Sequence, residues 1–352
     1  MFKYLGSKRV FVPVLGQIAR ASGARTAVDL FTGTTRVAQE FKRSGITTTA
    51  TDLATYSYVY AQTFIEQDGS KIDEGVLGEA IDYLDQLPGK PGYFTETFCR
   101  KSRFFQPKNG ARIDAIRNQI EEEFKGTDLY PILLTALIRA ADRVDSTTGV
   151  QMAYLKEWAP RSYNDLKLVA PKLIPGTGHA KLGDAMKLVD ELPRTDLMYL
   201  DPPYNQHRYF TNYHIWETLV RWDEPEVYGV ACKRVDARDP ELKSVFNSKP
   251  AMKDAFFDLL TRAKTDLYVI SYNDESWITK EQMTRALYDA GAEHVEALEF
   301  EHSRYVGALI GIHNLQGEKV GKVSHTKNTE WIFIAGDRDR VQAAARGAQQ
   351  RA

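Results

Sequence analysis

Leu197-Met198-Tyr199-Leu200-Asp201-Pro202-Pro203-Tyr204 is the stretch that decides the fold of this chain of 352 residues. The four apolar residues predict a buried strand, and because a double proline cannot continue a hydrogen-bond ladder, the strand must end at Asp201. An acid and an aromatic ring therefore follow the carboxyl end of a strand, where open α/β sheets bind ligands. The alternative is an ordinary strand-terminating turn, in which Asp and Pro are common.

The tetrapeptide Asp201-Pro202-Pro203-Tyr204 also indicates a chemistry. An exocyclic amino group on a nucleic-acid base is a poor nucleophile until acceptors hold its hydrogens, and the Asp201 carboxylate and the Pro202 carbonyl supply two acceptors. Proline has no N–H to compete and presents its carbonyl rigidly. The Tyr204 ring can stack on a base swung out of its duplex. All four residues, Pro203 included, form our predicted catalytic set, for methylation of an amino nitrogen on a base.

The segment from Thr26 to Thr35 predicts a strand and a Gly-containing turn, with a helix following from about Arg36 to Lys42. Such a turn lets a ligand approach the backbone. A second strand from Thr47 ends in Asp52, 19 positions after Gly33, and an acid there can accept hydrogen bonds from ribose hydroxyls. The dinucleotide fingerprint Gly-x-Gly-x-x-Gly is absent, which argues against a hydride-transfer enzyme. Taken alone, the turn fits a plain strand-to-helix connection equally well.

Three blocks, Phe2 to Lys8, Asp29 to Thr34 and Asp201 to Tyr204, occur in this order. In content and order they resemble the DNA adenine-N6 methyltransferases of the Dam-like, alpha-ordered group. The resemblance implies an α/β fold, a Rossmann-like S-adenosylmethionine-dependent methyltransferase sheet with a helical insertion domain. It also implies methyl transfer from S-adenosylmethionine to the 6-amino group of a flipped adenine in double-stranded DNA, with S-adenosylhomocysteine as product.

The resemblance assigns cofactor-binding residues position by position. In the family, the N-terminal block and the Gly turn bind S-adenosylmethionine, and acids after the strands hold its ribose and adenine. The matching positions here are Tyr4, Gly6, Ser7, Lys8, Asp29, Phe31, Gly33, Thr34, Asp52, Asp184 and Asp201. Thr35 departs from the pattern, because many members have a second glycine there. Lys8 could instead be a solvated charge, and Asp52 and Asp184 could instead cap the helices that follow them.

Apolar residues at helical spacing predict helices over Ile72 to Leu87, Ile113 to Phe124 and Tyr130 to Val144. We therefore expect a catalytic domain of residues 1–67 and 178–337, a helical target-recognition insertion of residues 68–177, and a tail of residues 338–352. The tail is expected to be a helix end or disordered.

Basic residues that can neutralise phosphates gather in two parts of the chain. Residues 96–117 hold six basic side chains against two acids, with Phe98, Phe104 and Phe105 among them to stack or wedge into bases, and residues 302–328 form a basic, glycine-rich loop. The predicted DNA-binding residues are Arg100, Lys101, Arg103, Lys108, Arg112, Arg208, Arg304 and Lys322. Lys233 and Arg234 lie in a further polar segment that could touch DNA. The alternative for residues 96–117 is a solvated helix face over a phenylalanine core.

The catalytic half continues as a strand over Asp266 to Ser271 and a helix over Thr279 to Ala290. Strands over His294 to Glu301 and Glu330 to Ala335 then predict the hairpin that closes a methyltransferase sheet. The helical stretch Ala185 to Leu192 follows Asp184.

Composition narrows the class of protein. The net charge of −1 excludes a globally basic nucleic-acid binder, so phosphate attraction must come from local patches. Cys99 and Cys232 are too few for a zinc or disulfide framework, and no apolar stretch is long enough to cross a bilayer. We expect a soluble, cytoplasmic monomer that uses no metal and no membrane, with double-stranded DNA as partner and a cognate restriction endonuclease left open.

Other activities stay open. RNA adenine or DNA cytosine-N4 methylation shares the chemistry, although the latter group usually has Ser at position 201. C5 methylation is disfavoured, because neither cysteine follows a proline as that nucleophile does. A catalytically idle DNA-binding module is the alternative from another class, and the intact motif and the Gly33 turn argue against it.

Overall fold

The computed structural model describes residues 8–203, 209–239, 243–303 and 327–349. The chain divides into two compact units. Unit 1 comprises Met1–Gly16, Arg25–Leu188 and His207–Ser244, and unit 2 comprises Gln17–Ala24, Val189–Gln206 and Val245–Ala352. These units cut the chain at other positions than the expected domains, whose boundaries stay a prediction.

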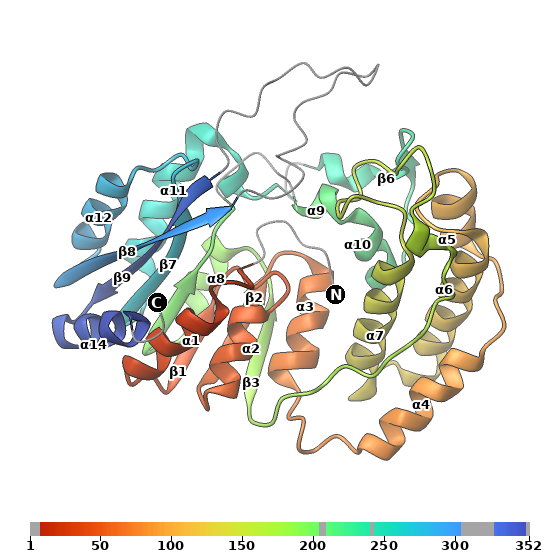
Figure 1. Ribbon diagram of the computed structural model, residues 1–352, viewed down its shortest axis with the longest axis horizontal. Helices are drawn as coiled ribbons and strands as arrows, with labels where there is room; N and C mark the ends of the chain where they lie inside the picture. Colours follow the sequence, from red (N-terminus) through yellow and green to blue (C-terminus); the bar gives the residue numbers. More distant parts are fainter. Residues whose placement is uncertain (1–7, 204–208, 240–242, 304–326, 350–352) are drawn as a thin grey trace. The chain divides into compact units, whose positions relative to one another are not determined.

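The central element is a seven-stranded sheet in the order β3-β2-β1-β4-β7-β9-β8 (Figure 1). Its strands are β1 Thr26–Asp29, β2 Thr47–Asp52, β3 Gly178–Leu182, β4 Leu197–Leu200, β7 Leu267–Asn273, β8 His294–Ser303 and β9 Lys327–Gly336. β2 pairs in parallel with β1 and β3, and β4 pairs in parallel with β7. β9 pairs antiparallel with both β7 and β8. The predicted Rossmann-like sheet and its closing hairpin are therefore confirmed.

Three helices accompany the first two strands, and the first of them precedes β1 and is divided between the two units after Gly16. α1 spans Val12–Ala21, α2 spans Arg36–Arg43, and α3 spans Thr55–Ala61 and continues as a π-helical turn over Gln62–Glu66. The buried Lys42 ammonium donates to the carbonyls of Phe64, Ile65 and Gln67, at 3.3, 2.8 and 2.6 Å. These carbonyls lie at a helix C-terminus, which favours a cation. Lys42 thus ties α2 to the end of α3.

The insertion folds as helices α4 Glu74–Gln86, α5 Tyr93–Thr95, α6 Pro107–Gln119 and α7 Leu129–Val144, drawn from orange to olive in Figure 1. Asp114 of α6 caps α5, because its carboxylate accepts from the backbone N–H groups of Phe94 and Thr95 at 2.9 and 2.8 Å. The rings of Phe98, Phe104 and Phe105 are fully buried. The idea that these rings stack on bases is therefore wrong, and the alternative of a phenylalanine core holds.

The last part of unit 1 carries α9 Tyr209–Asn212, α10 His214–Arg221 and the two-stranded ribbon of β5 Val227–Tyr228 and β6 Lys233–Arg234. The Arg234 guanidinium is buried and pairs with Asp223 and Asp236 at 2.6 and 2.7 Å. A buried guanidinium with two carboxylates anchors the ribbon on the fold. Arg234 is therefore a structural residue, which corrects the expectation that it could touch DNA.

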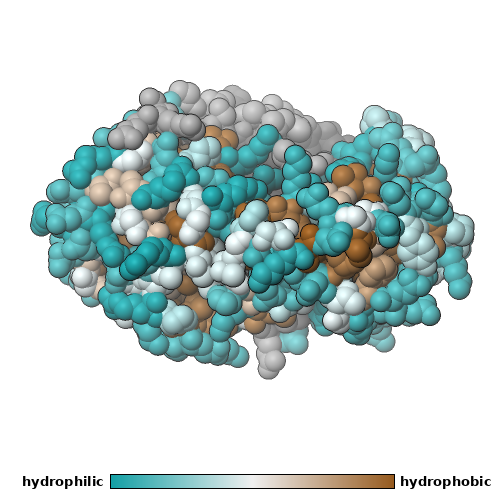
Figure 2. All heavy atoms as spheres, turned by 90° about the horizontal axis from the view of Figure 1, so that it is seen from below, coloured by the Kyte–Doolittle hydropathy of each residue, from teal (hydrophilic) through white to brown (hydrophobic). Residues whose placement is uncertain are grey.

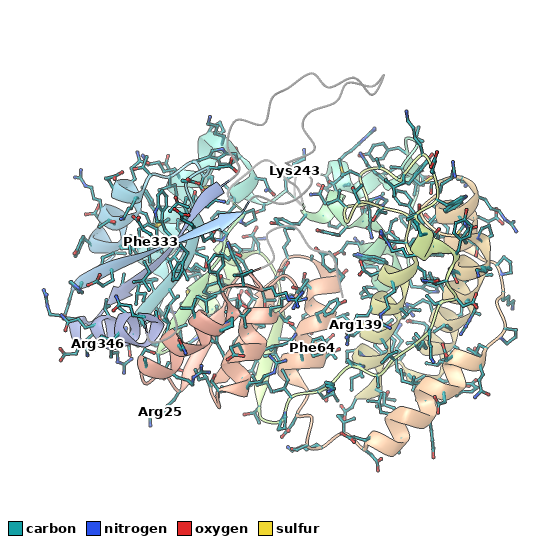
Figure 3. The ribbon with its side chains drawn as sticks, viewed as in Figure 1. Arg25, Phe64, Arg139, Lys243, Phe333 and Arg346 are labelled. Atoms are coloured by element: carbon teal, nitrogen blue, oxygen red, sulfur yellow. The ribbon has the colours of Figure 1, made fainter. Side chains whose placement is uncertain are left out.

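Unit 2 packs α11 Lys249–Arg262, α12 Lys280–Asp289 and α14 Arg338–Gln349 with β7, β8 and β9. The apolar centre of β9, which includes Phe333, is buried, whereas Arg346 extends from α14 (Figure 3). The predicted tail is therefore a helix through Gln349. The greater part of the predicted basic loop, residues 304–326, lies outside the described residues.

One face of the described surface is mainly polar. Figure 2 shows hydrophilic side chains spread over the face seen from below, with smaller apolar patches among them. Within the described ranges, every helix is too short or too polar to cross a membrane.

Candidate active site

The turn after β1 is held by Asp29, whose side chain is 1% exposed. Its carboxylate accepts from the Thr32 hydroxyl at 2.9 Å and from the backbone N–H of Ala38 at 3.2 Å. Because Ala38 lies in the first turn of α2, the acid joins the end of β1 to the start of the helix. Asp29 therefore fixes the backbone around Phe31, Gly33 and Thr34.

Gly33 and Thr35 both have a left-handed backbone, with φ of 51° and 62°. Only glycine adopts this region freely, and other residues lose about 1 kcal/mol or more there. Thr35 is fully buried, and its hydroxyl donates to the Thr34 carbonyl at 2.7 Å while accepting from Gln39 at 2.8 Å. The backbone conformation explains why many members of the resembled family have glycine at this position. In this chain, side-chain hydrogen bonds hold the same conformation.

Asp52 ends β2 and faces the Gly turn. Its Oδ2 accepts from the backbone N–H of Gly33 at 2.8 Å, and its Oδ1 accepts from the N–H of Ala54 at 2.9 Å. Burial raises the pKa of this carboxyl, whereas the backbone donors of Ala54, Gly33 and Leu53 act in the opposite direction. Each oxygen has a second lone pair, so the carboxylate can still accept from a hydroxyl of a ligand. Asp52 both shapes the turn and offers an acceptor beside it.

Asp184 follows β3 and precedes α8, Ala185–Glu191. Its carboxylate accepts from the backbone N–H of Met186 at 2.7 Å, which is the capping role considered for it. Lys8 is 8% exposed, so it is not a solvated charge, and its carbonyl accepts from the N–H groups of Phe11 and Val12 at 2.8 and 3.0 Å. Tyr4, Gly6 and Ser7 lie outside the described residues.

Charged side chains interact with one another around α2 and α7, a feature that the sequence analysis missed. Burial, followed by the charge of Arg9, lowers the pKa of the Arg36 guanidinium, to which Arg139 also contributes. Arg139, labelled in Figure 3, lies on α7, and Tyr60 interacts with both Arg139 and Arg36. The buried acid Asp142 of α7 acts on the pKa of Tyr60 in the opposite direction, so this group contains charges of both signs.

In unit 2, β4 ends at Leu200, so the chain leaves the sheet at Asp201 as predicted. The four residues of β4 are at most 1% exposed, and the Tyr199 hydroxyl donates to the Ser271 hydroxyl of β7 at 2.9 Å. This packing fixes the end of β4, from which the motif begins. Asp201 is partly exposed and Pro202 is buried, while Tyr204 and Arg208 lie outside the described residues.

The predicted DNA-binding side chains of the insertion have partners within the protein. Arg100 pairs with Glu96, and Lys108 pairs with Asp165 at 2.6 Å, all four being largely exposed. Such exposed pairs contribute 0 to about 1 kcal/mol, so DNA phosphates could replace the acids.

Two further members of this set are held more firmly. Arg112 is partly buried and donates to Asp85 at 3.1 Å and to the Leu166 carbonyl at 3.0 Å. Arg103 stacks on Trp158 at 4.8 Å and donates to the Lys156 carbonyl at 2.8 Å. Lys101 is exposed, and Arg304 and Lys322 lie outside the described residues. A role in DNA binding stays a prediction for all of them.

Arg117 and Glu217 are two charged residues whose burial the sequence analysis did not predict. Arg117, counted there with the basic stretch, is 1% exposed and donates to the carbonyls of Leu219 and Val220 at 2.8 and 2.9 Å. Glu217 of α10 is also 1% exposed, and burial raises the pKa of its carboxyl to about 7. An acid inside an apolar helix sequence was the available signal for Glu217.

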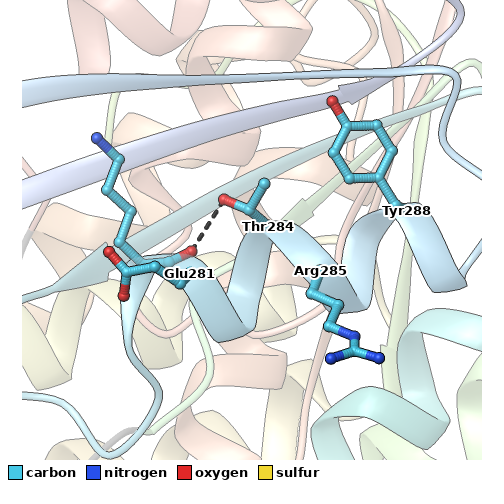
Figure 4. A pocket seen from close by; sticks show the side chains of 5 residues that line it. Glu281, Thr284, Arg285 and Tyr288 are labelled. Carbon is cyan, nitrogen blue, oxygen red and sulfur yellow. Dashed lines mark hydrogen bonds between the residues drawn. The ribbon is translucent and has the colours of Figure 1, made fainter.

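A surface pocket of about 460 Å³ lies over α12, away from every predicted site residue in sequence (Figure 4). Its lining residues are Lys280, Glu281, Thr284, Arg285 and Tyr288. The Thr284 hydroxyl donates to the Lys280 carbonyl at 2.9 Å, which is a bond within the helix. These side chains form a solvated helix face.

Known proteins resemble this chain over most of its length. The family described as D12 class N6 adenine-specific DNA methyltransferase matches residues 4–286. The Type II methyltransferase M.NlaIII of Neisseria lactamica is 32% identical over 87% of this chain and 88% of its own length. The Type II methyltransferase M.CviAII of Paramecium bursaria Chlorella virus 1 is 30% identical over 81% of this chain and 86% of its own length. Modification methylase StsI of Streptococcus sanguinis is 30% identical over 83% of this chain. The match covers only 47% of the length of StsI.

Proposed function

Because the chain belongs to the D12 class of N6 adenine-specific DNA methyltransferases, we propose that it transfers a methyl group from S-adenosylmethionine to the 6-amino group of an adenine in duplex DNA. The observation that carries the proposal is the buried strand β4, which ends at the acid and two prolines of the motif. The left-handed turn at Gly33 with its acid Asp52 supports a cofactor site of the kind that the reaction needs.

The residues of unit 1 fit S-adenosylmethionine, which supplies an electrophilic methyl group on its sulfonium. Gly33 has no side chain to obstruct the backbone of the turn, and Asp52 offers carboxylate lone pairs to ribose hydroxyls. Asp184 is proposed to hold the adenine of S-adenosylmethionine. Lys8, Asp29, Phe31 and Thr34 are proposed as the surrounding wall, together with Tyr4, Gly6 and Ser7 of the preceding segment.

In the proposed mechanism, the Asp201 carboxylate and the Pro202 carbonyl accept the two hydrogens of the adenine amino group. This removes the nitrogen lone pair from conjugation with the ring, so that it can attack the methyl carbon. The bond from nitrogen to the methyl carbon would form as the carbon–sulfur bond breaks, S-adenosylhomocysteine would be the leaving group, and the resulting ammonium would give its proton to water. Pro203 stiffens the loop, and the ring of Tyr204 stacks on the flipped base.

Duplex DNA is the proposed partner, bound through phosphate contacts of the exposed basic residues. "Type II" and "modification" in the relatives' names support a role beside a restriction endonuclease. A cytoplasmic location is part of the proposal.

The test compares wild type with Asp201→Ala, and with Asp190→Ala as control because Asp190 is an exposed acid that pairs with Arg262. Transfer of labelled methyl to DNA should fall by about 10²- to 10³-fold in Asp201→Ala, as for loss of a transition-state acceptor, and stay normal in the control. Sequencing of modified bases should then find N6-methyladenine at one short sequence. A near-normal rate in Asp201→Ala would remove Asp201 from the mechanism, and methylated cytosine alone would overturn the function.

A further inference from the structure

The buried carboxylate of Glu217 joins two helices that are far apart in sequence. Glu217 lies on α10, and its carboxylate accepts hydrogen bonds from the Thr55 hydroxyl and, at 3.4 Å, from the backbone N–H of Tyr56. Thr55 and Tyr56 are the first two residues of α3, where backbone N–H groups have no partner within the helix. The residue before them, Ala54, has no side-chain oxygen to cap the helix. Glu217 therefore caps α3 from a different helix.

This cap adjoins the cofactor-side acid. Asp52 accepts from the N–H of Ala54, and Thr55 follows directly. The stretch from Asp52 to Tyr56 thus has a carboxylate at each end, Asp52 holding the Gly33 turn and Glu217 holding the helix. If the first turn of α3 loosens, Ala54 moves, and the carboxylate of Asp52 loses one of the two N–H groups that fix it.

α10 is itself pinned by the insertion. Gln151 is 2% exposed and makes three hydrogen bonds with the segment around the start of α10. Its N–H donates to the Asn212 carbonyl at 2.8 Å, its Oε1 accepts from the N–H of Ile215 at 2.9 Å, and its carbonyl contacts His214 Nε2 at 3.0 Å. α10 begins ten residues after Tyr204 in the sequence. α10 therefore connects the Gln151 segment of the insertion with the first turn of α3.

We propose that Glu217 is a positioning residue for cofactor binding, which acts through Thr55 and the first turn of α3 to hold Asp52 in place. The inference rests on the proposed function, because it assigns Asp52 to the ribose of S-adenosylmethionine. It makes cofactor affinity depend on α10, a helix that carries none of the predicted cofactor ligands.

The charge state of Glu217 provides a specific signature. Burial raises its pKa to about 7, while Thr55, Tyr56, Arg221 and Arg234 act in the opposite direction. A hydrogen bond to a carboxylate is about twice as strong as a neutral one, so the cap weakens when Glu217 takes up a proton. Cofactor affinity should therefore fall as the pH decreases through about 7.

The experiment is calorimetric titration of the full chain with S-adenosylmethionine, without DNA, from pH 5.5 to 8.5. In wild type, affinity should rise about tenfold across a step near pH 7, the expected effect of a charge-assisted hydrogen bond. Glu217→Gln, which is permanently neutral, should bind with the weaker affinity and lack that step. Any step that survives belongs to another group, such as Asp52, whose pKa is also raised by burial.

Asp114→Asn is the matched control. Asp114 is also 1% exposed and also caps a helix, but its contacts are with α5 in the insertion. This variant should keep the affinity and the step of wild type even if it lowers the melting temperature. Thr55→Val removes the hydroxyl donor while preserving shape, so it should weaken binding, and adding Glu217→Gln to it should have little further effect.

Equal affinity and an equal pH step in wild type and Glu217→Gln would overturn the inference. Should Glu217→Gln fail to fold, Thr55→Val decides, because an unchanged affinity there would overturn it as well. Failure of the proposed function is distinguishable, since it would appear as wild type that leaves adenine unmethylated in DNA.

Discussion

Replacing Asp52 by Asn is the sharpest test of the cofactor site, because the two side chains have nearly the same shape. Both carboxylate oxygens accept from backbone N–H groups, one from Gly33 at 2.8 Å and one from Ala54 at 2.9 Å. Asn has a single oxygen, so its NH2 group must face one of these donors. The substitution therefore removes one hydrogen bond to a charged acceptor. It also places the NH2 group against a backbone N–H, so that two donors face each other.

The magnitude follows from these contacts. A hydrogen bond to a charged group contributes about 1.5–3 kcal/mol, so the free energy of unfolding should fall by roughly that amount. The ribose hydroxyls lose a charged acceptor too, and the same range corresponds to an affinity for S-adenosylmethionine about 10- to 150-fold weaker. Binding should therefore weaken at a temperature where the variant is still folded.

Calorimetric titration with S-adenosylmethionine and urea unfolding of the unliganded protein measure the two effects separately. Asp73→Asn is the control for a simple helix cap, since the Asp73 carboxylate accepts from the N–H groups of Gly75 and Val76 within its own turn, at 2.8 and 3.1 Å. Asp52→Asn should weaken binding more than this control. If Asp52→Asn binds the cofactor as wild type does, Asp52 is only a structural acid and the ribose assignment is refuted.

Three further predictions concern stability and DNA binding. Arg117→Met removes the donor from the carbonyls of Leu219 and Val220, whereas Glu121 keeps Lys125 and Tyr130 as partners. The free energy of unfolding in urea should therefore fall by about 1–3 kcal/mol with cofactor affinity unchanged, and full stability would refute this. Burial raises the pKa of folded Glu217 to about 7 against an ordinary 4.5, because the cost of burying its charge exceeds the gain from the hydrogen bonds of the cap. Although the charged carboxylate caps α3 better, the global stability that Glu217 contributes is therefore complete below about pH 4.5 and lost as the pH rises through 7. The free energy of unfolding in urea should therefore fall by about 3 kcal/mol more in wild type than in Glu217→Gln over that pH range. Parallel plots of this free energy against pH would contradict the prediction. Charge reversal at Arg103 and Lys108 should weaken DNA binding and reduce its salt slope by about one unit per lost phosphate contact, whereas unchanged slopes would leave both residues as a solvated face.

The sequence predicts those parts of the fold that depend on local rules. β4 ends at Leu200 as expected, because two prolines cannot extend a strand. The helix expected from Tyr130 to Val144 is α7, Leu129–Val144, since apolar residues at three- and four-residue spacing define a buried face. The acid at the end of β2 is likewise found beside the Gly33 turn.

Features that depend on distant partners could not be predicted. Glu217 and Thr55 are 162 positions apart, so no local pattern marks the acid as a cap for α3. Residues 96–117 show basic and aromatic side chains together, but only the tertiary packing reveals that Phe98, Phe104 and Phe105 are core residues. Arg117 has the same charge as its exposed neighbours and differs from them only in burial.

The position of β8 as the last strand of the sheet affects how the protein behaves at high concentration. A ten-residue edge strand is a template on which another chain can add a strand, the first step toward aggregation. β8 carries Glu296, Glu299 and Glu301 along its length. Two copies of β8 that met edge to edge would bring these acids together, and like charges on paired strands are destabilising. Like charges on this edge strand thus disfavour sheet-to-sheet polymerisation.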